Sequence, residues 1–236
     1  MNVQTERDYY TADRNTGGQK RNSIYQIWEQ GGALGDSVTP STFVPEYRSH
    51  IRSKIASLLN VDSRIISLGC GNAFIESDLV QAGYQVDAID CQPEAVSIAS
   101  QKGVHARCAD FMELSAASLQ QYDFVYADGF FGHLCETDAG ISNALSLLHR
   151  AIAARTCVLI SNDAPRGAGF SLNGRNGVAS TFEAHPQVPG FWYLSREYLS
   201  SALAEEGFSV LECYYFPYSR PISGQRNRTI GLAVAR

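Results

Sequence analysis

Two hydrophobic periods alternate along the chain from residue 64 onward, and they predict alternating strands and helices. Short apolar runs are typical of buried strands, whereas apolar residues that recur every three or four positions indicate amphipathic helices. The predicted strands are residues 65–68, 85–89, 105–108, 123–127, 158–161, 209–216 and 228–234. The predicted helices are residues 74–82, 93–101, 139–153 and 196–206. This order predicts an α/β fold in which helices cover both faces of a mostly parallel sheet.

The last two predicted strands differ from the others because no helix separates them. They are joined by "FPYSRPISGQRN", residues 216–227, and a connection this short can only join antiparallel strands. We therefore expect a three-layer sandwich around a seven-stranded, mostly parallel sheet whose final strand is antiparallel. The carboxyl ends of the parallel strands meet at one edge, which is where sheets of this class bind ligands.

The N-terminal region has a different pattern. Residues 1–22 are polar, and apolar residues recur at helical spacing in residues 23–30 and again in residues 45–60. We expect residues 1–60 to form a helical lid, because they lie outside the strand–helix alternation. Residues 61–236 then form the ligand-binding domain.

Composition and charge narrow the class of protein. A chain of 236 residues, of which 44% are hydrophobic and 18% charged, fits one globular domain with an appendage. The net charge of −5 argues against nucleic acid as a partner, although Arg220, Arg226 and Arg228 could form a local basic patch. No apolar run approaches the roughly 20 residues that span a bilayer, and the polar N-terminus lacks the apolar stretch of a signal peptide. We expect a cytoplasmic monomer or homodimer with no nucleic-acid or membrane partner.

The six cysteines give no sign of a metal site or a disulfide framework. No two of them form a Cys-x-x-Cys pair, and several lie at or next to predicted strands. We interpret them as small buried thiols of a reducing compartment, and we expect no bound metal.

Four of the predicted strands end in glycine or acidic residues. The first is followed by Gly69 and Gly71, whose bare backbones allow a sharp turn and a close approach of amide groups to a ligand. The second ends at Asp90, an acid placed to accept hydrogen bonds from a ribose diol. Asp110 follows the third strand, and Asp128 follows the fourth. In a parallel sheet these four positions converge on one pocket.

This combination resembles the class I S-adenosylmethionine-dependent methyltransferases, which have a Rossmann-like fold, over roughly residues 65–236. The resemblance implies S-adenosylmethionine as the cofactor. In such enzymes the Gly-x-Gly loop holds the methionine part, the acid after the second strand holds the ribose, and the acid after the third lies near the adenine. The cofactor-binding residues that the resemblance implies are Gly69, Cys70, Gly71, Asp90, Cys91, Asp110, Phe111, Asp128 and Gly129.

Two positions depart from the family pattern. Ser67 stands where many members carry an acid two residues before the first glycine, and Ala73 stands where many carry a third glycine. Ser67 leaves open what holds the ammonium group of the cofactor, for which Asp128 or a backbone carbonyl is available. A dinucleotide-binding sheet is the competing interpretation, but its G-x-G-x-x-G motif would need glycine in place of Phe74.

Residues near the same edge are candidates for binding and activating the acceptor. His133 could act as a general base, or it could cap the next helix or fill space. With Asn162, at the end of the fifth strand, and Tyr193, in an aromatic run before a helix, it makes up the predicted catalytic set. Aromatic faces suit a sulfonium cation, although Tyr25 and Trp28 could equally be packing residues. The predicted substrate-contacting residues are Tyr10, Tyr25, Trp28, Phe131 and Asp163.

These features predict an enzyme of specialised metabolism that transfers a methyl group from S-adenosylmethionine to an oxygen or nitrogen of a small metabolite. The reaction is an in-line displacement, so alignment and desolvation supply most of the rate. One alternative keeps the cofactor but has its own amine attack the aminocarboxypropyl carbon, which gives azetidine-2-carboxylate and 5′-methylthioadenosine. A non-catalytic cofactor-binding module is a second alternative, although a scaffold would not need polar strand ends. The nucleoside product separates the three.

Overall fold

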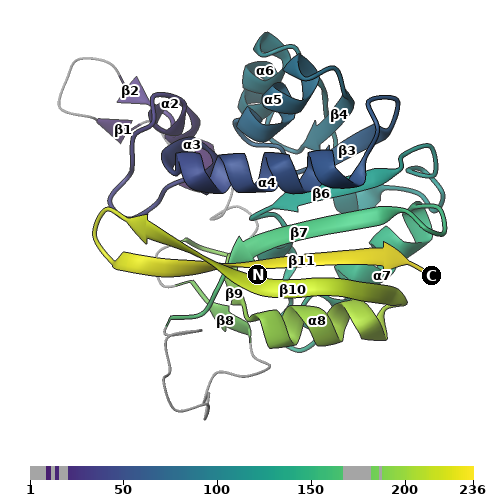
Figure 1. The fold of residues 1–236 in the computed structure, drawn as a ribbon. Helices are drawn as coiled ribbons and strands as arrows, with labels where there is room; N and C mark the ends of the chain where they lie inside the picture. Colours follow the sequence, from purple (N-terminus) through teal and green to yellow (C-terminus); the bar gives the residue numbers. More distant parts are fainter. Residues whose placement is uncertain (1–8, 12–13, 16–20, 167–181, 186–187) are drawn as a thin grey trace.

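The computed structural model describes residues 9–11, 14–15, 21–166, 182–185 and 188–236, and a seven-stranded sheet lies at their centre (Figure 1). The strands lie in the order β10-β11-β7-β6-β3-β4-β5. Their bounds are β3 Arg64–Leu68, β4 Gln85–Asp90, β5 His105–Cys108, β6 Phe124–Asp128, β7 Cys157–Asp163, β10 Phe208–Arg220 and β11 Gly224–Ala235. Neighbouring strands are parallel except at β11, which runs antiparallel to both β10 and β7. The predicted fold class, with its antiparallel final strand, is confirmed.

Helices cover both faces of this sheet. One face carries α4 (Pro45–Leu58), α5 (Phe74–Gln81) and α6 (Pro93–Gln101), whose apolar side chains share one core cluster with it. The other face carries α7 (Ser142–Ala151) and α8 (Arg196–Glu205), which share a second cluster. The sheet therefore has a core on each side, and two smaller apolar clusters lie around α2 and around Phe191.

Alternation along the inner strands fills both cores. In β6, Phe124 and Tyr126 belong to the cluster under α4, α5 and α6, whereas Val125 and Ala127 belong to the cluster under α7 and α8. All four residues are at most 1% exposed. A strand that is buried on both faces gives a continuous apolar run, and that run is the signal that predicts it.

Shorter elements connect these layers. Apart from α2, they are too short for a hydrophobic period to predict them. They are β1 Arg14–Asn15, β2 Arg21–Asn22, α2 Ile24–Glu29, α3 Pro40–Phe43, the 3₁₀ turns η1 Phe111–Glu113 and η2 Phe131–Leu134, β8 Phe182–Ala184 and β9 Trp192–Leu194.

The β10–β11 hairpin is longer than the sequence pattern predicts. Both strands continue through residues expected to form a loop, and the chain turns only at residues 221–223. The extension reaches past the end of β7 toward α2 and α3 (Figure 1). Because the extension packs against the strand ends, Arg220, Arg226 and Arg228 are at most 6% exposed. These three arginines, which the sequence left as a possible local basic patch, therefore belong to the interior and form no surface patch.

Polar contacts hold the N-terminal helix α2 against the sheet domain. The side chains of Ser23 and Gln26 donate to Glu94 of α6 at 2.6 and 2.9 Å. At the other end of the helix, Glu29 accepts a hydrogen bond from Lys102 at 2.8 Å. Helix α4 differs, because its buried side chains belong to the core of the domain itself. A boundary between lid and domain at residue 60 stays a prediction.

The six cysteines are free thiols. Cys70 and Cys135 are buried as expected, whereas Cys91 and Cys108 are exposed. The difference at Cys108 arises because β5 is the edge strand of the sheet, so most of its side chains face solvent. Among the residues that the structure describes, no helix is long and apolar enough to cross a membrane.

Candidate active site

A cavity of about 380 Å³ lies at the edge where the parallel strands end. Its wall includes the residues that follow β3, β4 and β5 and the ends of β6 and β7. Tyr25 and Trp28 of α2, together with residues 37–41, which lead into the first turn of α3, line it from the N-terminal side. The cavity thus joins the four strand ends that the sequence predicts to converge.

The loop after β3 requires glycine at its first position. Gly69 and Gly71 have φ angles of +67° and +50°, which side-chain-bearing residues rarely adopt. A Cβ atom at Gly69 would also clash with the ring of Phe130. Ala73 adopts φ +51° just before α5, at a cost of roughly 1–2 kcal/mol. The chain therefore keeps the left-handed turn even where alanine replaces the family's third glycine.

Asp90 and Asp110 are fixed by backbone amides. Asp90 accepts hydrogen bonds from the amides of Gly71 and Gln92 at 3.0 and 2.9 Å, and its burial raises its pKa. Asp110 caps η1 by accepting from the amide of Met112 at 2.8 Å. Both acids line the cavity. Each is pre-positioned to accept further hydrogen bonds there.

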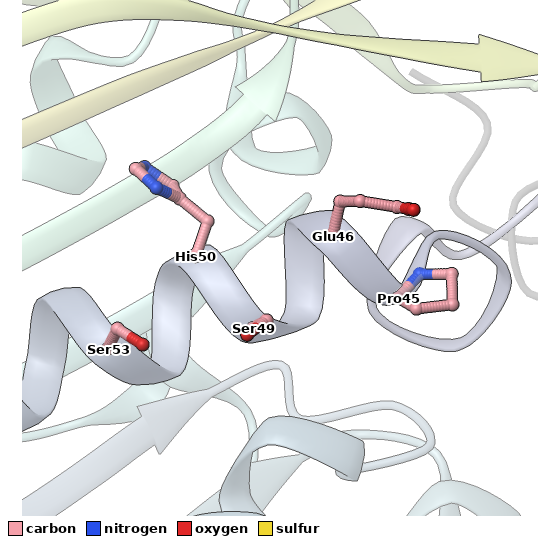
Figure 2. A pocket seen from close by; sticks show the side chains of 5 residues that line it. All are labelled: Pro45, Glu46, Ser49, His50 and Ser53. Carbon is pink, nitrogen blue, oxygen red and sulfur yellow. The ribbon is translucent and has the colours of Figure 1, made fainter.

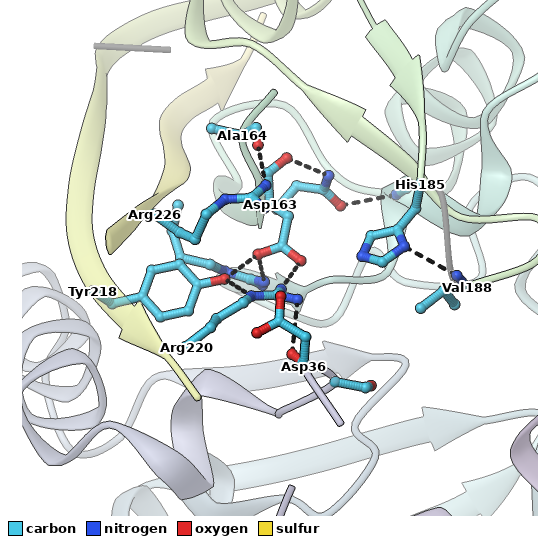
Figure 3. Close-up of polar contacts among 12 residues, drawn as sticks. Asp36, Asp163, Ala164, His185, Val188, Tyr218, Arg220 and Arg226 are labelled. Carbon is cyan, nitrogen blue, oxygen red and sulfur yellow. Dashed lines mark hydrogen bonds and ion pairs between the residues drawn. The ribbon is translucent and has the colours of Figure 1, made fainter. Parts of the chain in front are cut away.

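The β7 side of the cavity holds a buried charge cluster (Figure 3). Asp163 forms ion pairs with Arg220 and with Arg228, the latter at 2.9 Å, and accepts a hydrogen bond from Tyr218 at 2.7 Å. The side chains of the three charged residues are at most 6% exposed. Burial opposes ionisation, but the two guanidinium groups outweigh it and hold the pKa of Asp163 well below its usual range.

Arg228 extends this cluster to the end of β6. Its guanidinium also pairs with Asp128 and donates to the hydroxyl of Ser161 at 3.1 Å. The Tyr47 hydroxyl, from α4, lies 3.0 Å from Asp128 Oδ1 and 2.6 Å from Ser161 Oγ. Asp128 and Asp163 therefore both have cationic partners inside the protein.

Aromatic side chains close the cavity near the N-terminal residues. Tyr10 lies in a helical turn at residues 9–11, and its hydroxyl is 2.9 Å from His133 Nε2. The ring of Tyr10 stacks on Tyr25, and the ring of Phe191 lies 4.7 Å from that of His133. All four residues line the cavity. This arrangement brings a hydroxyl and an imidazole together on a largely apolar wall.

Two further titratable residues line the cavity. Glu76, in the first turn of α5, is 4% exposed and accepts a hydrogen bond from the Ser67 hydroxyl at 2.6 Å. Burial raises the pKa of Glu76 to about 7. His185 accepts from the amide of Val188 at 3.0 Å, and burial lowers its pKa to about 4, so its imidazole is neutral near pH 7.

Most of the residues singled out from the sequence line this cavity. They include all the residues predicted to bind the cofactor, from the loop at residues 69–71 to Gly129. The predicted catalytic and substrate-contacting residues that also line the cavity are His133, Tyr10, Tyr25, Trp28 and Asp163. Their contacts with ligands stay predictions.

Asn162, Tyr193 and Phe131 do not border the cavity. Asn162 is fully buried, accepts a hydrogen bond from the amide of Gly132 at 3.1 Å and donates to the carbonyl of Trp192 at 2.9 Å. Tyr193 and Phe131 are 1% and 0% exposed and lie within apolar clusters. Position near a strand end or in an aromatic run suggested these three residues, but their side chains point into the interior.

Glu76, Arg220, Arg228 and His185 line the cavity without having been predicted there. The signal for Glu76 was its position in the first turn of the helix that follows the Gly69 loop. The sequence shows that Arg220 and Arg228 lie close together in the chain, but it predicts a loop where the β10–β11 hairpin continues. Nothing in the sequence around His185 distinguishes it from a surface histidine.

A wider hollow of about 540 Å³ lies elsewhere, over the outer face of α4 (Figure 2). It is lined by Pro45, Glu46, Ser49, His50 and Ser53, which all belong to that one helix. Side chains from a single helix face do not converge on a ligand, so the strand-end cavity is the candidate site.

Comparison with known proteins supports the same assignment. A family model described as a methyltransferase domain matches residues 65–153. The chain is also 46% identical over 228 residues to the tabtoxin biosynthesis enzyme of Pseudomonas amygdali pv. tabaci, a match that covers 96% of this chain and 86% of that protein. The chain belongs to the class I S-adenosylmethionine-dependent methyltransferase family. Its cofactor is S-adenosylmethionine, and the predicted enzyme class is confirmed.

Solved structures of this methyltransferase fold include enzymes with different reactions. The 1,6-didemethyltoxoflavin-N1-methyltransferase of Burkholderia thailandensis, solved with 1,6-didemethyltoxoflavin and S-adenosylhomocysteine, is 18% identical with a TM-score of 0.59. That match covers 89% of this chain and 84% of that one. The cyclase SpnF is 14% identical with a TM-score of 0.60, covering 89% of this chain and 95% of that one. At these identities the likeness concerns the fold alone.

Proposed function

We propose that this methyltransferase acts on a small metabolite of specialised metabolism, at an oxygen or nitrogen atom. The observation that carries the proposal is one cavity with two unlike sides. Glycine and carboxylate groups of β3, β4 and β5 suit a nucleoside, whereas the β7 side offers charged and aromatic groups to a second molecule. The 46% identical relative is named for the biosynthesis of tabtoxin, which supports a role in specialised metabolism.

The cofactor side fits an adenosyl compound. Gly69 and Gly71 leave backbone space where a Cβ atom would be strained or would clash. Asp90 and Asp110 supply carboxylates that backbone amides already orient, as needed for a ribose diol and an adenine amine. Bound S-adenosylmethionine supplies the electrophilic methyl group. The protein contributes alignment and exclusion of water.

The acceptor side favours a metabolite with an anionic group. A guanidinium group has five N–H donors. The hydrogen bonds of Arg220 to the hydroxyl of Tyr218, to the carbonyl of Asp36 and to Asp163 use three. Arg228 likewise has three such bonds. Both arginines line the cavity, so their remaining donors are available to a carboxylate or a similar group.

The Tyr10–His133 pair suits a proton transfer from the acceptor. Their hydroxyl and imidazole are hydrogen-bonded at 2.9 Å on the cavity wall. A hydroxyl or amine that is methylated loses a proton, and the His133 imidazole lies on the cavity wall where it could accept that proton. The rings of Tyr25 and Phe191 beside the pair exclude water from this side.

Product analysis tests this function. The protein is incubated with S-adenosylmethionine alone and then with small metabolites, each supplied as matched carboxylate and amide forms. We expect S-adenosylhomocysteine to form only with an acceptor, and the carboxylate form to be preferred. Binding of the cofactor without any turnover would instead support a non-catalytic module.

Cyclisation of the cofactor is a second candidate function. The cavity volume of about 380 Å³ lies near the lower end of the roughly 300–1,000 Å³ typical of ligand sites, which limits the room for a second molecule. The fold does not decide the question, because SpnF, a [4+2]-cyclase, shows that this fold also serves reactions other than methyl transfer. Formation of 5′-methylthioadenosine together with an equal amount of azetidine-2-carboxylate, without an acceptor, would establish cyclisation.

A further inference from the structure

Glu76 is a buried carboxylate without a cationic partner at the wall of the cavity. It is 4% exposed, and the hydroxyl of Ser67 donates to it at 2.6 Å. Among the described residues, no arginine, lysine or histidine forms an ion pair with it. A buried carboxylate is costly unless it is paired, hydrogen-bonded or protonated. The Ser67 hydroxyl and the amide of Glu76 itself leave part of the acceptor capacity of the carboxylate unused.

The other carboxylates of the cavity are satisfied within the protein. Asp128 and Asp163 pair with buried arginines. Asp90 and Asp110 accept hydrogen bonds from backbone amides. Glu76 differs from these four, because its local donors are the Ser67 hydroxyl and its own amide, and Lys102 attracts it without forming an ion pair. It is therefore the carboxylate best placed to receive a cation from a ligand.

The position of Glu76 indicates which cation this is. Its partner Ser67 lies in β3, two residues before Gly69. Gly69 begins the loop where the methionine end of the cofactor is expected. That end carries an α-ammonium group. Many family members have an acid at the position of Ser67, and here the acid comes instead from the next helix.

We propose that Glu76, oriented by Ser67, binds the α-ammonium group of S-adenosylmethionine and so takes the place of the missing strand-end acid. This assignment rests on the proposed function, because it places the cofactor's methionine end at the Gly69 loop. Asp128 is then free for its ion pair with Arg228 and does not need to bind the cofactor.

Cofactor binding should consequently release a proton. Burial holds the pKa of Glu76 at about 7, so near pH 7 about half of the ligand-free molecules carry this proton. A bound ammonium group favours the carboxylate and lowers that pKa. The protonated half must therefore release its proton to the buffer when the ligand binds, and affinity should fall as the pH drops below 7.

Calorimetry with two nucleosides tests the proposal. S-adenosylhomocysteine carries the amino-acid end, whereas 5′-methylthioadenosine has the same adenosine without it. In Glu76→Gln, which keeps an acceptor for the Ser67 hydroxyl, we expect affinity for S-adenosylhomocysteine to fall roughly 10- to 100-fold. Affinity for 5′-methylthioadenosine should stay within about twofold, since that ligand has no ammonium group. Glu205→Gln, at an exposed position of α8, should change neither.

Proton release gives a second readout. Titrations in buffers of different ionisation enthalpy at pH 7 should show release of roughly half a proton in the wild type and none in Glu76→Gln. If Glu76→Gln does not fold, Ser67→Ala is the second variant, because it keeps the carboxylate but removes the hydroxyl that orients it. It should lower the affinity for S-adenosylhomocysteine by a smaller factor and leave the affinity for 5′-methylthioadenosine unchanged.

Three results would overturn the assignment. Equal losses for both nucleosides would mean that Glu76 supports the site as a whole, and no loss for either would remove it from the site. If the wild type bound S-adenosylhomocysteine no more tightly than 5′-methylthioadenosine, the amino-acid end would contribute no affinity, and this would exclude an ammonium subsite. Failure of the wild type to bind either nucleoside is a distinct outcome, which contradicts the proposed function itself.

Discussion

The two sides of the cavity are built in different ways. On the cofactor side, backbone amides of the strand-end loops fix the polar groups, such as Asp90 with the amides of Gly71 and Gln92. On the acceptor side, side chains from distant segments meet, and Arg228 pairs with Asp128 across 100 residues of sequence. The comparison teaches that a local motif can specify one half of a site while the completed tertiary fold specifies the other. Changes on the acceptor side should therefore affect stability more.

The largest expected effect is on the stability of the acceptor side. Asp163→Asn removes the negative charge that Arg220 and Arg228 share. An uncompensated buried charge costs about 3–5 kcal/mol, so the free energy of unfolding should fall by that amount. Denaturant titration measures it.

Asp62→Asn is the matched control, because Asp62 is exposed in the turn before β3. It should change the free energy of unfolding by less than about 0.5 kcal/mol. If Asp163→Asn were equally mild, the charge cluster would contribute little to folding and the contrast between the two sides would fail.

Glu76 predicts how stability depends on pH. Its pKa is about 7 in the folded protein, against 4.5 for the unperturbed group. The folded state therefore holds the proton more tightly than the unfolded state, so stability of the ligand-free protein falls as pH rises from 4.5 to 7. Integrated over that window, the loss is about 3 kcal/mol at most. Glu76→Gln should lack this part of the pH dependence in paired unfolding curves, whereas identical curves would show that Glu76 is not buried as a free acid.

Asp90→Ala tests the cofactor side. In this variant the binding free energy of S-adenosylhomocysteine should become less favourable by more than about 1 kcal/mol. A charge-assisted hydrogen bond to the ligand is lost, and the Gly71 amide loses its acceptor. Calorimetry measures the affinity, and the unfolding midpoint checks that the fold is retained. Unchanged affinity in a folded variant would remove Asp90 from the site.

The smallest expected effect is at the aromatic wall. Tyr10→Phe keeps the ring that stacks on Tyr25 but removes the hydroxyl that contacts His133. We expect kcat to fall about tenfold, with cofactor affinity unchanged, if the pair handles the acceptor proton. Tyr9→Phe, next to it in the same helical turn, is the control. A loss of affinity instead of rate would make Tyr10 a packing residue.

Much of the cofactor side could be predicted because its signals are local. Gly69 and Gly71 mark a turn with positive φ angles, and Asp90 ends an apolar run. The inner strands were equally easy to predict, since β6 is buried on both faces and its sequence is an uninterrupted apolar segment. Parallel topology then brings these positions together without further information.

The acceptor side could not be predicted in the same way. Tyr218 and Arg220 lie where proline, serine and glycine suggest a loop, although the strands continue there. Asn162 was predicted to be catalytic from its place at a strand end, but it does not border the cavity. Its side chain instead forms hydrogen bonds with the backbone of Gly132 and Trp192. Neither outcome is encoded in a short window, since each depends on which distant segment packs alongside. The cytoplasmic location and the monomer or homodimer state stay predictions.

The late position of β11 in the chain has a consequence for biosynthesis. A nascent polypeptide that has emerged only as far as residue 223 already contains the Gly69 loop, Asp90 and Glu76, but not Arg228. Asp163 already has its partner Arg220 in that segment, whereas Asp128 still lacks Arg228, the cation with which it pairs in the folded protein. The ion pairs of the acceptor side are therefore complete only after β11 has been synthesised, whereas every residue of the Gly69 loop is present long before.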